Sequence, residues 1–273
     1  MSTADFDFAV HITDQMGWGL AKSDFEFMME LEPKGCFVLL EDSEKIGIAT
    51  TVSFGKIAWF GNLIVNESRR GRGAGSQLVN HALEYLKTRN VETVGLYAYM
   101  ERIPFYKRLG FKSGSDFIVM KGKAFPSPVS AGVRQAGKQD TEKIIDFDRS
   151  CFGESRKKML EPILSDPDNL CQVGIEDEKI VGYSVAKVFR GTTELGPLVC
   201  EKGRIKTAIN LLRATLNSLK GLEVSLFVPE KEDSILSMLI EDGFSQTFKV
   251  ERMFQGPPVA KDCVYMAESL ERG

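Results

Sequence analysis

The sequence has 273 residues, of which 43% are hydrophobic and 27% charged, as in a soluble globular protein with a substantial core. The net charge of −3 gives no reason to expect a nucleic-acid partner or an anionic membrane surface. No apolar run approaches the roughly 20 residues that a membrane span needs, so we expect no membrane partner either.

The elements expected in the first half follow from hydrophobic periodicity and turn residues. Short helices are expected within 14–32, around the segment MGWG. Strands are expected at 35–41, 45–53 and 56–65, followed by a helix at 73–88. A strand at 93–99, a helix at 103–109 and a strand at 114–121 complete the series.

The second half repeats this pattern. Segments CFVLLEDSEKIGIATT and CQVGIEDEKIVGYSVAK each predict a strand, a charged turn and a second strand that starts near a glycine. Two glycine pairs keep an offset of 135 positions: Gly47 with Gly182, and Gly61 with Gly196. Amphipathic helices SQLVNHALEYL and INLLRATLNSL follow, and then FYKRLGF and SMLIEDGF, whose glycines are 133 apart.

A proline-containing segment, GKAFPSPVS at 122–130, lies between the two copies and predicts a linker. We therefore expect an α+β protein with two tandem units at 1–123 and 130–273. Each unit would be a mixed, mostly antiparallel sheet flanked by helices. The second unit would open with a strand, a turn and a helix that starts near Asp140 or Thr141.

The termini and cysteines indicate a cytoplasmic protein. The start, MSTADFDFAV, lacks the basic lead and apolar block of a signal peptide. The five cysteines have no metal-ligand spacing, and we expect reduced, mostly buried thiols and no metal site. They are Cys36, Cys151, Cys171, Cys200 and Cys263.

The segment RRGRGAG, between the strand at 56–65 and the helix at 73–88, is the strongest local signal. Glycines allow positive φ and close approach of a ligand, and the free N–H groups of a helix start favour an anion. Arg70 and Arg72 would add charge-assisted hydrogen bonds to a phosphate. The Walker pattern needs Lys-Ser/Thr after the last glycine, where this chain has Ser76-Gln77, and glycines at 71, 73 and 75 do not fit the dinucleotide pattern. An RNA-binding Arg/Gly run is the alternative interpretation.

Arg70-Gly71-Arg72-Gly73-Ala74-Gly75 resembles the Arg/Gln-x-x-Gly-x-Gly/Ala signature of the GCN5-related N-acetyltransferase (GNAT) superfamily. About thirty residues later, FYKRLGF resembles the family's second signature, Tyr-x-x-x-Gly-Phe. The resemblance covers residues 38–121, with both motifs in the family's order. The tandem form is similar to predicted acetyltransferases whose second half is GNAT-like.

The resemblance implies that acetyl-CoA lies in a gap between the parallel strands at 57–65 and 93–99. It places the pyrophosphate on the loop amides and the pantetheine arm along the first strand. The implied cofactor-binding residues are Leu63, Ile64, Val65, Arg70, Gly71, Arg72, Gly73, Ala74, Gly75 and Ser76.

The resemblance also implies acetyl transfer to an amine, with Tyr106 as the proton donor to the leaving thiolate. The alternative is that Tyr106 only packs against the cofactor. Glu101 is the nearest candidate base, with Asp24 and Glu26 as others. Trp18, Asn62 and Tyr99 are candidate substrate-binding residues, and Tyr99 stands where many members carry asparagine. The acceptor would be a small-molecule or peptide amine.

The second copy has lost the signature residues. At an offset of 135, Arg70 and Gly73 correspond to Ile205 and Ala208, and at 133 Tyr106 corresponds to Leu239. We therefore expect no chemistry there. The second copy could complete the acceptor site, continue the first sheet or form a homodimer. Alternatively, it binds its own ligand through CEKGRIK.

For the whole protein, a non-catalytic acyl-CoA sensor is the function that competes with the acetyltransferase, and a nucleic-acid module is a third hypothesis.

Overall fold

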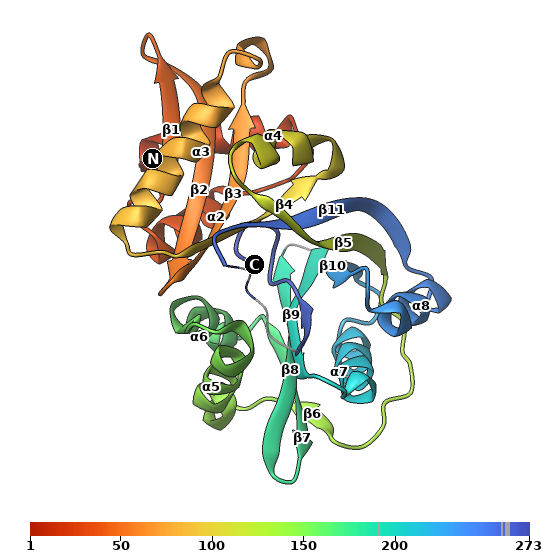
Figure 1. The fold of residues 1–273 in the computed structure, drawn as a ribbon. Coiled ribbons are helices and arrows are strands. Elements are labelled where there is room, and N and C mark those ends of the chain that lie inside the picture. Colours follow the sequence, from red (N-terminus) through yellow and green to blue (C-terminus); the bar gives the residue numbers. More distant parts are fainter. Residues whose placement is uncertain (190–191, 258, 260–262) are drawn as a thin grey trace.

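The computed structural model describes residues 1–189, 192–257, 259 and 263–273. Two groups of strands and helices, one from each half of the chain, are joined where β5 and β11 cross the centre of the molecule (Figure 1). The end of the chain lies at this centre rather than at the periphery of the second half.

The first half has the expected order of elements. The bounds are α1 (Phe6–Asp14), α2 (Lys22–Leu31), β1 (Cys36–Glu41), β2 (Glu44–Phe54), β3 (Ile57–Val65), α3 (Ala74–Thr88), β4 (Thr93–Tyr99), α4 (Ile103–Arg108) and β5 (Lys112–Lys123). From β1 onward, each lies within two residues of its expected bounds. The helix α1 was missed, although Asp7 in its first turn and the buried residues Phe6, Ala9 and Ile12 are signals of a helix.

The second half repeats the first, as the sequence repeat predicted. Its bounds are β6 (Val133–Gln135), α5 (Thr141–Phe152), α6 (Lys157–Ser165), β7 (Leu170–Glu176), β8 (Lys179–Phe189), β9 (Thr192–Glu201), α7 (Ile205–Ser218), β10 (Glu223–Pro229), α8 (Asp233–Glu241), β11 (Ser245–Gln255) and β12 (Cys263–Met266). The fold is α+β, with a mixed sheet flanked by helices.

The two halves exchange their last strands. In the described residues, one sheet of 12 strands runs β1-β2-β3-β4-β11-β5-β10-β9-β8-β7-β6, with β12 paired to β9. Thus β11 of the second half lies between β4 and β5 of the first, and β5 lies between β11 and β10. The second half therefore continues the first sheet, which was one of the options left open by the sequence.

Helices cover both faces of this sheet. Helix α3 packs on one face of the first half through Leu78, Val79 and Ala82, whereas α1 and α2 cover the other. A core on that second face joins the halves, because Met28 of α2 shares it with residues of α5 and α6. Helices α7 and α8 bury the opposite face of the second half.

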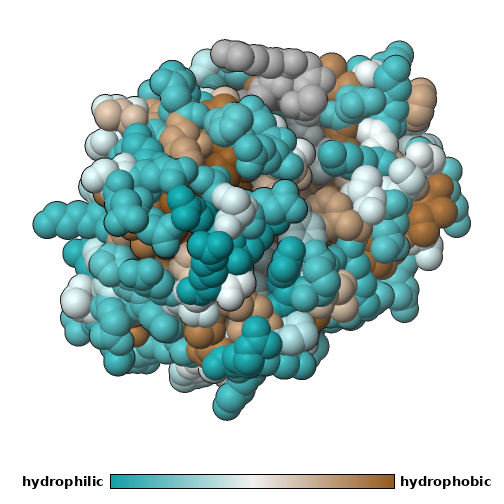
Figure 2. All heavy atoms as spheres, turned by 90° about the horizontal axis from the view of Figure 1, so that it is seen from above, coloured by the Kyte–Doolittle hydropathy of each residue, from teal (hydrophilic) through white to brown (hydrophobic). Residues whose placement is uncertain are grey.

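The face of the molecule drawn in Figure 2 is mostly polar. In the view from above, hydrophilic side chains dominate and hydrophobic ones form small, separate patches (Figure 2). Among the helices of the described chain, none combines the length and apolar character that crossing a bilayer requires.

The segment between the halves, at 124–132, forms neither helix nor strand. Asn217 of α7 holds it at Ser127, whose N–H donates to Asn217 Oδ1 at 2.8 Å. The proposed boundaries at 123 and 130 remain a prediction. Because β5 and β11 each pair across the boundary, the two sequence units do not form two separate sheets.

The cysteines differ from expectation at one pair. Cys151 of α5 and Cys263 of β12 form a disulfide, whereas the sequence led us to expect five reduced thiols. The two cysteines are 112 residues apart in the sequence and become neighbours only in the folded chain, so nothing in the sequence indicated this pair. Cys36, Cys171 and Cys200 are free, and burial raises the pKa of each thiol to about 12.

The strand exchange generates a testable expectation. A protease site inserted between Pro128 and Val129, both exposed, allows the chain to be cut without touching the sheet. We expect the cut halves to elute together in size-exclusion chromatography and to separate only in denaturant, because separation would expose the paired edges of β5 and β11. Separate elution under native conditions would contradict the exchanged topology.

Candidate active site

The strands β3 and β4 separate part-way along their length. They pair in parallel only at Ile57 with Thr93, Ala58 with Val94, and Trp59 with Gly95. Beyond these pairs β4 stays bound to β11 through Tyr99. A gap therefore opens between the carboxyl ends of two neighbouring parallel strands, where α/β sheets commonly bind ligands.

Backbone groups of β3 face this gap. Asn66 donates its N–H to the carbonyl of Ile46 in β2, at 2.8 Å. Successive strand residues turn their backbone groups to opposite sides, so those of Val65 point away from β2 and toward β4. The side chains of Leu63, Ile64 and Val65 pack in the sheet, so only their main chain is offered there.

The loop after β3 leaves a set of amides without partners. No N–H group from Gly71 through Ser76 hydrogen-bonds any described residue; the first bond of the helix is Gln77 N–H to the carbonyl of Gly73. Gly71 and Gly73 have φ of 77° and 89°, and a β carbon on either would meet nothing within 4 Å. Open space, free amides and the positive end of α3 together form a site for an anion such as a diphosphate.

The two arginines of the loop behave differently. Arg70 donates its Nε to the carbonyl of Val65 at 2.8 Å, so part of its guanidinium braces the loop against β3. Arg72 is exposed beside Gly71 and Gly73. Of the two, Arg72 is the one whose position leaves it free to meet an anion.

The second motif packs against the first. A β carbon on Gly75 would lie 3.5 Å from the ring of Phe105 in α4. The next residue, Tyr106, is buried with its ring 5.0 Å from that of Phe105 and 5.8 Å from that of Phe111. Its hydroxyl has no hydrogen bond to a described residue and is not completely enclosed by protein atoms.

Burial raises the pKa of Tyr106 well above its usual value, and the charge of Arg102 opposes this only in part. The phenol therefore stays protonated across the physiological range, which is the state that a proton donor needs.

The candidate bases are less well placed. Glu101 lies in the turn after β4, with its side chain 67% exposed and only a 4.0 Å contact with Arg102. Glu26 is exposed on α2, and Asp24 accepts a hydrogen bond from the N–H of Ala21 at the start of that helix. None of these three carboxylates is held over the gap by the described residues.

The substrate candidates lie on the face opposite α3. Trp18 donates its Nε1 to the hydroxyl of Tyr99 at 3.0 Å, so the α1–α2 connection and the end of β4 are joined there. Phe248 of β11 adds a ring 5.3 Å from that of Tyr99, which brings the second half into this wall. Asn62 sits in a bulge of β3 at φ 50° and donates to Thr50 at 3.1 Å, so its amide is turned into the sheet.

The corresponding gap in the second half is filled by the chain itself. β9 and β10 pair in parallel up to Leu195 with Leu226, and β12 then pairs with β9 from Leu198 to Glu201. At the offset of 135, those residues correspond to 63–66 of β3. Because β12 takes these backbone hydrogen bonds, a strand-like ligand has no room there, which argues against the second-site alternative.

After β12 the chain crosses to the first half. Gly196 lies under the carbonyl of Ala267, and its counterpart Gly61 lies under Glu271. A β carbon on Gly61 would be 2.5 Å from Cβ and 2.7 Å from Cα of Glu271. We call residues 267–273 the crossing segment. Sequence reasoning missed it; the only local signal was the spacing of Glu268 and Arg272, four residues apart.

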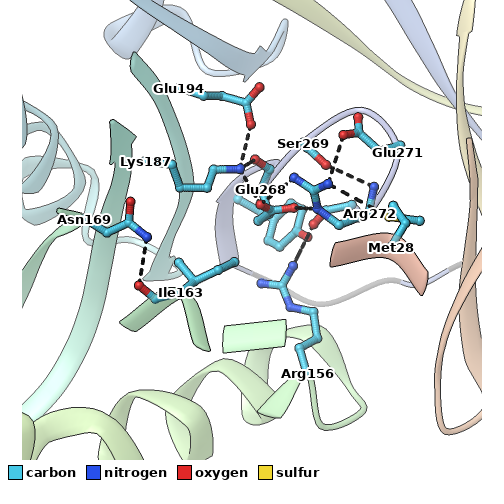
Figure 3. A network of polar contacts seen from close by, with 12 residues as sticks. Met28, Arg156, Ile163, Asn169, Lys187, Glu194, Glu268, Ser269, Glu271 and Arg272 are labelled. Atoms are coloured by element: carbon cyan, nitrogen blue, oxygen red, sulfur yellow. Dashed lines mark hydrogen bonds and ion pairs between the residues drawn. The ribbon is translucent and has the colours of Figure 1, made fainter. Parts of the chain in front are cut away.

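A buried ionic network anchors the crossing segment (Figure 3). Lys187 of β8 contacts both Glu194 of β9 and Glu268, and Arg272 Nε bonds Glu268 at 2.8 Å. Burial alone would raise the pKa of Glu268, but Arg272 and Lys187 outweigh it and hold that pKa below its usual value. Arg156, which is paired with Asp148, donates from Nη1 to the carbonyl of Gly273 at 2.7 Å.

Comparison with known sequences settles the family. Residues 9–111 match the sequence model described as "Acetyltransferase (GNAT) family", and residues 144–265 match that described as "Acetyltransferase (GNAT) domain". The chain belongs to the GNAT superfamily. It is a tandem member, because the two matches follow one another and together cover well over half of the chain.

Curated relatives of this GNAT protein carry similar names. It is 21% identical over 194 residues to "Uncharacterized N-acetyltransferase YitH" of Bacillus subtilis, covering 70% of this chain and 67% of the relative. It is 32% identical over 98 residues to "Uncharacterized N-acetyltransferase MJ1207" of Methanocaldococcus jannaschii, covering 32% and 43%. The chain thus spans two thirds of one relative and under half of the other.

A solved structure shares the whole fold. A putative acetyltransferase from Pyrococcus horikoshii superposes with a TM-score of 0.84 at 22% identity, covering 100% of this chain and 94% of the other. The family and the relatives' names support acyl transfer as the class of activity.

The loop geometry yields a prediction with a matched control. Gly73→Glu should abolish CoA binding measured by calorimetry, because it places a carboxylate and a side chain in the amide cradle. The left-handed φ adds a strain of roughly 1–2 kcal/mol. Gly203→Glu carries the same strain, since Gly203 has φ 82° and open space in the corresponding loop of the second half.

The control should lower the melting temperature similarly and leave CoA affinity unchanged. Unchanged affinity in the Gly73 variant would show that the diphosphate is not held by this loop.

Proposed function

We propose that the protein is an acetyl-CoA-dependent N-acetyltransferase whose chemistry takes place in the first half alone. The observation that carries this proposal is the open gap between β3 and β4, next to six amides that bond no described residue. The family membership supports acyl transfer, and the filled gap of the second half leaves one site for the thioester.

The chain's own groups divide the work of binding. The amides of Gly71 to Ser76 and the guanidinium of Arg72 would hold the diphosphate. The main chain of Leu63 and Val65 would pair with the pantetheine arm, which takes the place that β12 takes along β9. Acetyl-CoA supplies a thioester carbonyl for an amine to attack.

Tyr106 would assist the leaving sulfur. Because burial lifts the pKa of its phenol above that of a thiol near 8.5, full proton transfer to the thiolate is uphill. We therefore expect Tyr106 to act mainly by donating a hydrogen bond as the negative charge develops, and to pass on a proton that the nitrogen returns.

A non-catalytic acyl-CoA sensor remains the competing function. It shares the gap and the cradle but gives Tyr106 no task beyond packing. A cytoplasmic location and a homodimeric state both remain predictions from the sequence.

The variant that separates enzyme from sensor is Tyr106→Phe. It removes one hydroxyl that bonds no described residue, so the melting temperature should hardly change. We expect kcat for CoA release, with an amine found in a substrate panel, to fall by about 100-fold while the KM for acetyl-CoA stays near that of the wild type. Wild-type turnover by this variant would contradict the donor role, and CoA binding without turnover of any amine by the wild type would favour the sensor.

A further inference from the structure

The crossing segment places the main chain of Glu271 at the mouth of the first-half gap. Gly61 is two residues beyond Trp59, the last residue of β3 that pairs with β4. Gly61 shares the face of Trp59, away from α3, because Phe60 between them packs in the core under α3. The main chain of Glu271 lies directly over Gly61, so it covers the point where the strands begin to separate.

The wall around this point is aromatic. Leu270 packs in a cluster that includes Tyr97 and Tyr99 of β4 and Phe248 of β11. Trp18 closes the same wall through its hydrogen bond to Tyr99. Residues of both halves thus surround a place on the side of the gap opposite the helix that holds the anion cradle.

Glu271 keeps one oxygen free. Its Oε1 lies 3.1 Å from Nη1 of Arg272, which is itself bound to Glu268 (Figure 3). Its Oε2 has no hydrogen-bond partner among the described residues, and the side chain is 16% exposed. Oε2 therefore keeps its capacity to accept a hydrogen bond from a ligand.

The charges around Glu271 do not balance. Two cations, Lys187 and Arg272, face three carboxylates, Glu194, Glu268 and Glu271. The phenols of Tyr97 and Tyr99 are the titratable groups that β4 contributes, and β3 contributes none at Gly61. With every carboxylate ionised, the cluster has one negative charge in excess, and a largely buried excess charge is costly unless a cation or a proton joins it.

Burial raises the pKa of Glu271 above its usual value, against the charge of Arg272 and with the help of Glu194 and Glu268. A proton therefore binds Glu271 more readily than an exposed glutamate, and a bound cation would take over the same compensating role.

We propose that Glu271 is the residue of the acceptor site that binds the ammonium group of the substrate and then takes its proton. This rests on the proposed function and names the acceptor class as a primary amine on an apolar or flat body. Such a body would pack against Trp18, Tyr99 and Phe248, where a cation also gains from the aromatic faces.

The proton transfers balance. The ammonium gives one proton to the carboxylate of Glu271, and the neutral nitrogen forms a bond to the acetyl carbon. The carbon–sulfur bond breaks, the thiolate receives a second nitrogen proton by way of Tyr106, and Glu271 releases its proton to solvent. The products are the N-acetylated amine, CoA and one proton.

The test begins with binding. Benzylamine is titrated into the CoA-loaded full-length protein by calorimetry, with benzyl alcohol as its neutral counterpart. We expect the wild type to bind benzylamine more tightly than the alcohol, and Glu271→Gln to weaken the amine by about tenfold or more. CoA affinity and melting temperature should stay unchanged, because glutamine preserves the shape of the side chain.

Two further variants keep the result interpretable. Glu161→Gln removes a carboxylate that is 52% exposed on α6, and it should bind benzylamine like the wild type. Gly61→Ala does not alter the glutamate itself, but the added methyl group would push the main chain of Glu271 away from β3. Amine binding should therefore fall while CoA binding remains.

Kinetics provide the second readout. With an amine that the wild type acetylates, kcat/KM should rise with pH through the raised pKa of Glu271, because only the ionised form can take a proton. In Glu271→Gln this acid limb should vanish and kcat should drop by about 100-fold.

The outcomes separate the two proposals. Equal benzylamine affinity in the wild type and Glu271→Gln, or no preference of the wild type for the amine over the alcohol, would overturn the ammonium site. Specific amine binding that depends on Glu271, without acetyl transfer to any amine, would leave the ammonium site standing and refute the proposed enzyme.

Discussion

The pairing of β4 with β11 is the constraint on which the rest of the structure depends. All six residues of β4 from Val94 to Tyr99 pair with β11, whereas only Thr93, Val94 and Gly95 pair with β3. The direction of β4 beyond Gly95 is therefore set by a strand of the other half. The gap beside β3 exists because β4 follows that strand, so the half that carries the two motifs owes the shape of its gap to the half that lacks them.

The gap between β3 and β4 is open, whereas the gap between β9 and β10 is filled by β12. The loops beside the two gaps differ in the same sense. In the first half, glycines leave the loop amides unbonded next to an open strand edge. In the second half, Arg204 of the corresponding loop is tied to Glu176 and Glu201, and β12 occupies the edge. In the first half, the backbone hydrogen-bonding groups of the loop and the strand edge are available to a ligand. In the second half, the strand edge of β9 is hydrogen-bonded to β12. Both copies thus have a packed core, while only the first has the motif residues and the open strand edge.

Local features were readable from the sequence, and long-range ones were not. The periodicity of residues 35–121 predicted each strand and helix to within two residues, and the glycine run predicted the free amides at the start of α3. The repeat offset also predicted the second half. Nothing local distinguishes β11 as a strand of the other half, since exchanged and unexchanged strands have the same pattern of apolar residues. Glu271 was missed for the same reason, because its neighbour Gly61 lies 210 positions earlier in the chain. Conversely, Glu101 was chosen because it lies just beyond the strand next to β3, and its side chain is 67% exposed in the fold.

The exchange of strands also fixes when the molecule can become complete during its synthesis. In the first half, β4 lacks its neighbour β11 until the chain has been synthesised to about residue 255. Until then β4 presents an unpaired edge, and β5 has no partner on either side before β10 is made. Contacts of such large sequence separation slow folding and leave strand edges exposed meanwhile. The first motif is thus synthesised within the first third of the chain, long before the strands that complete the sheet around it.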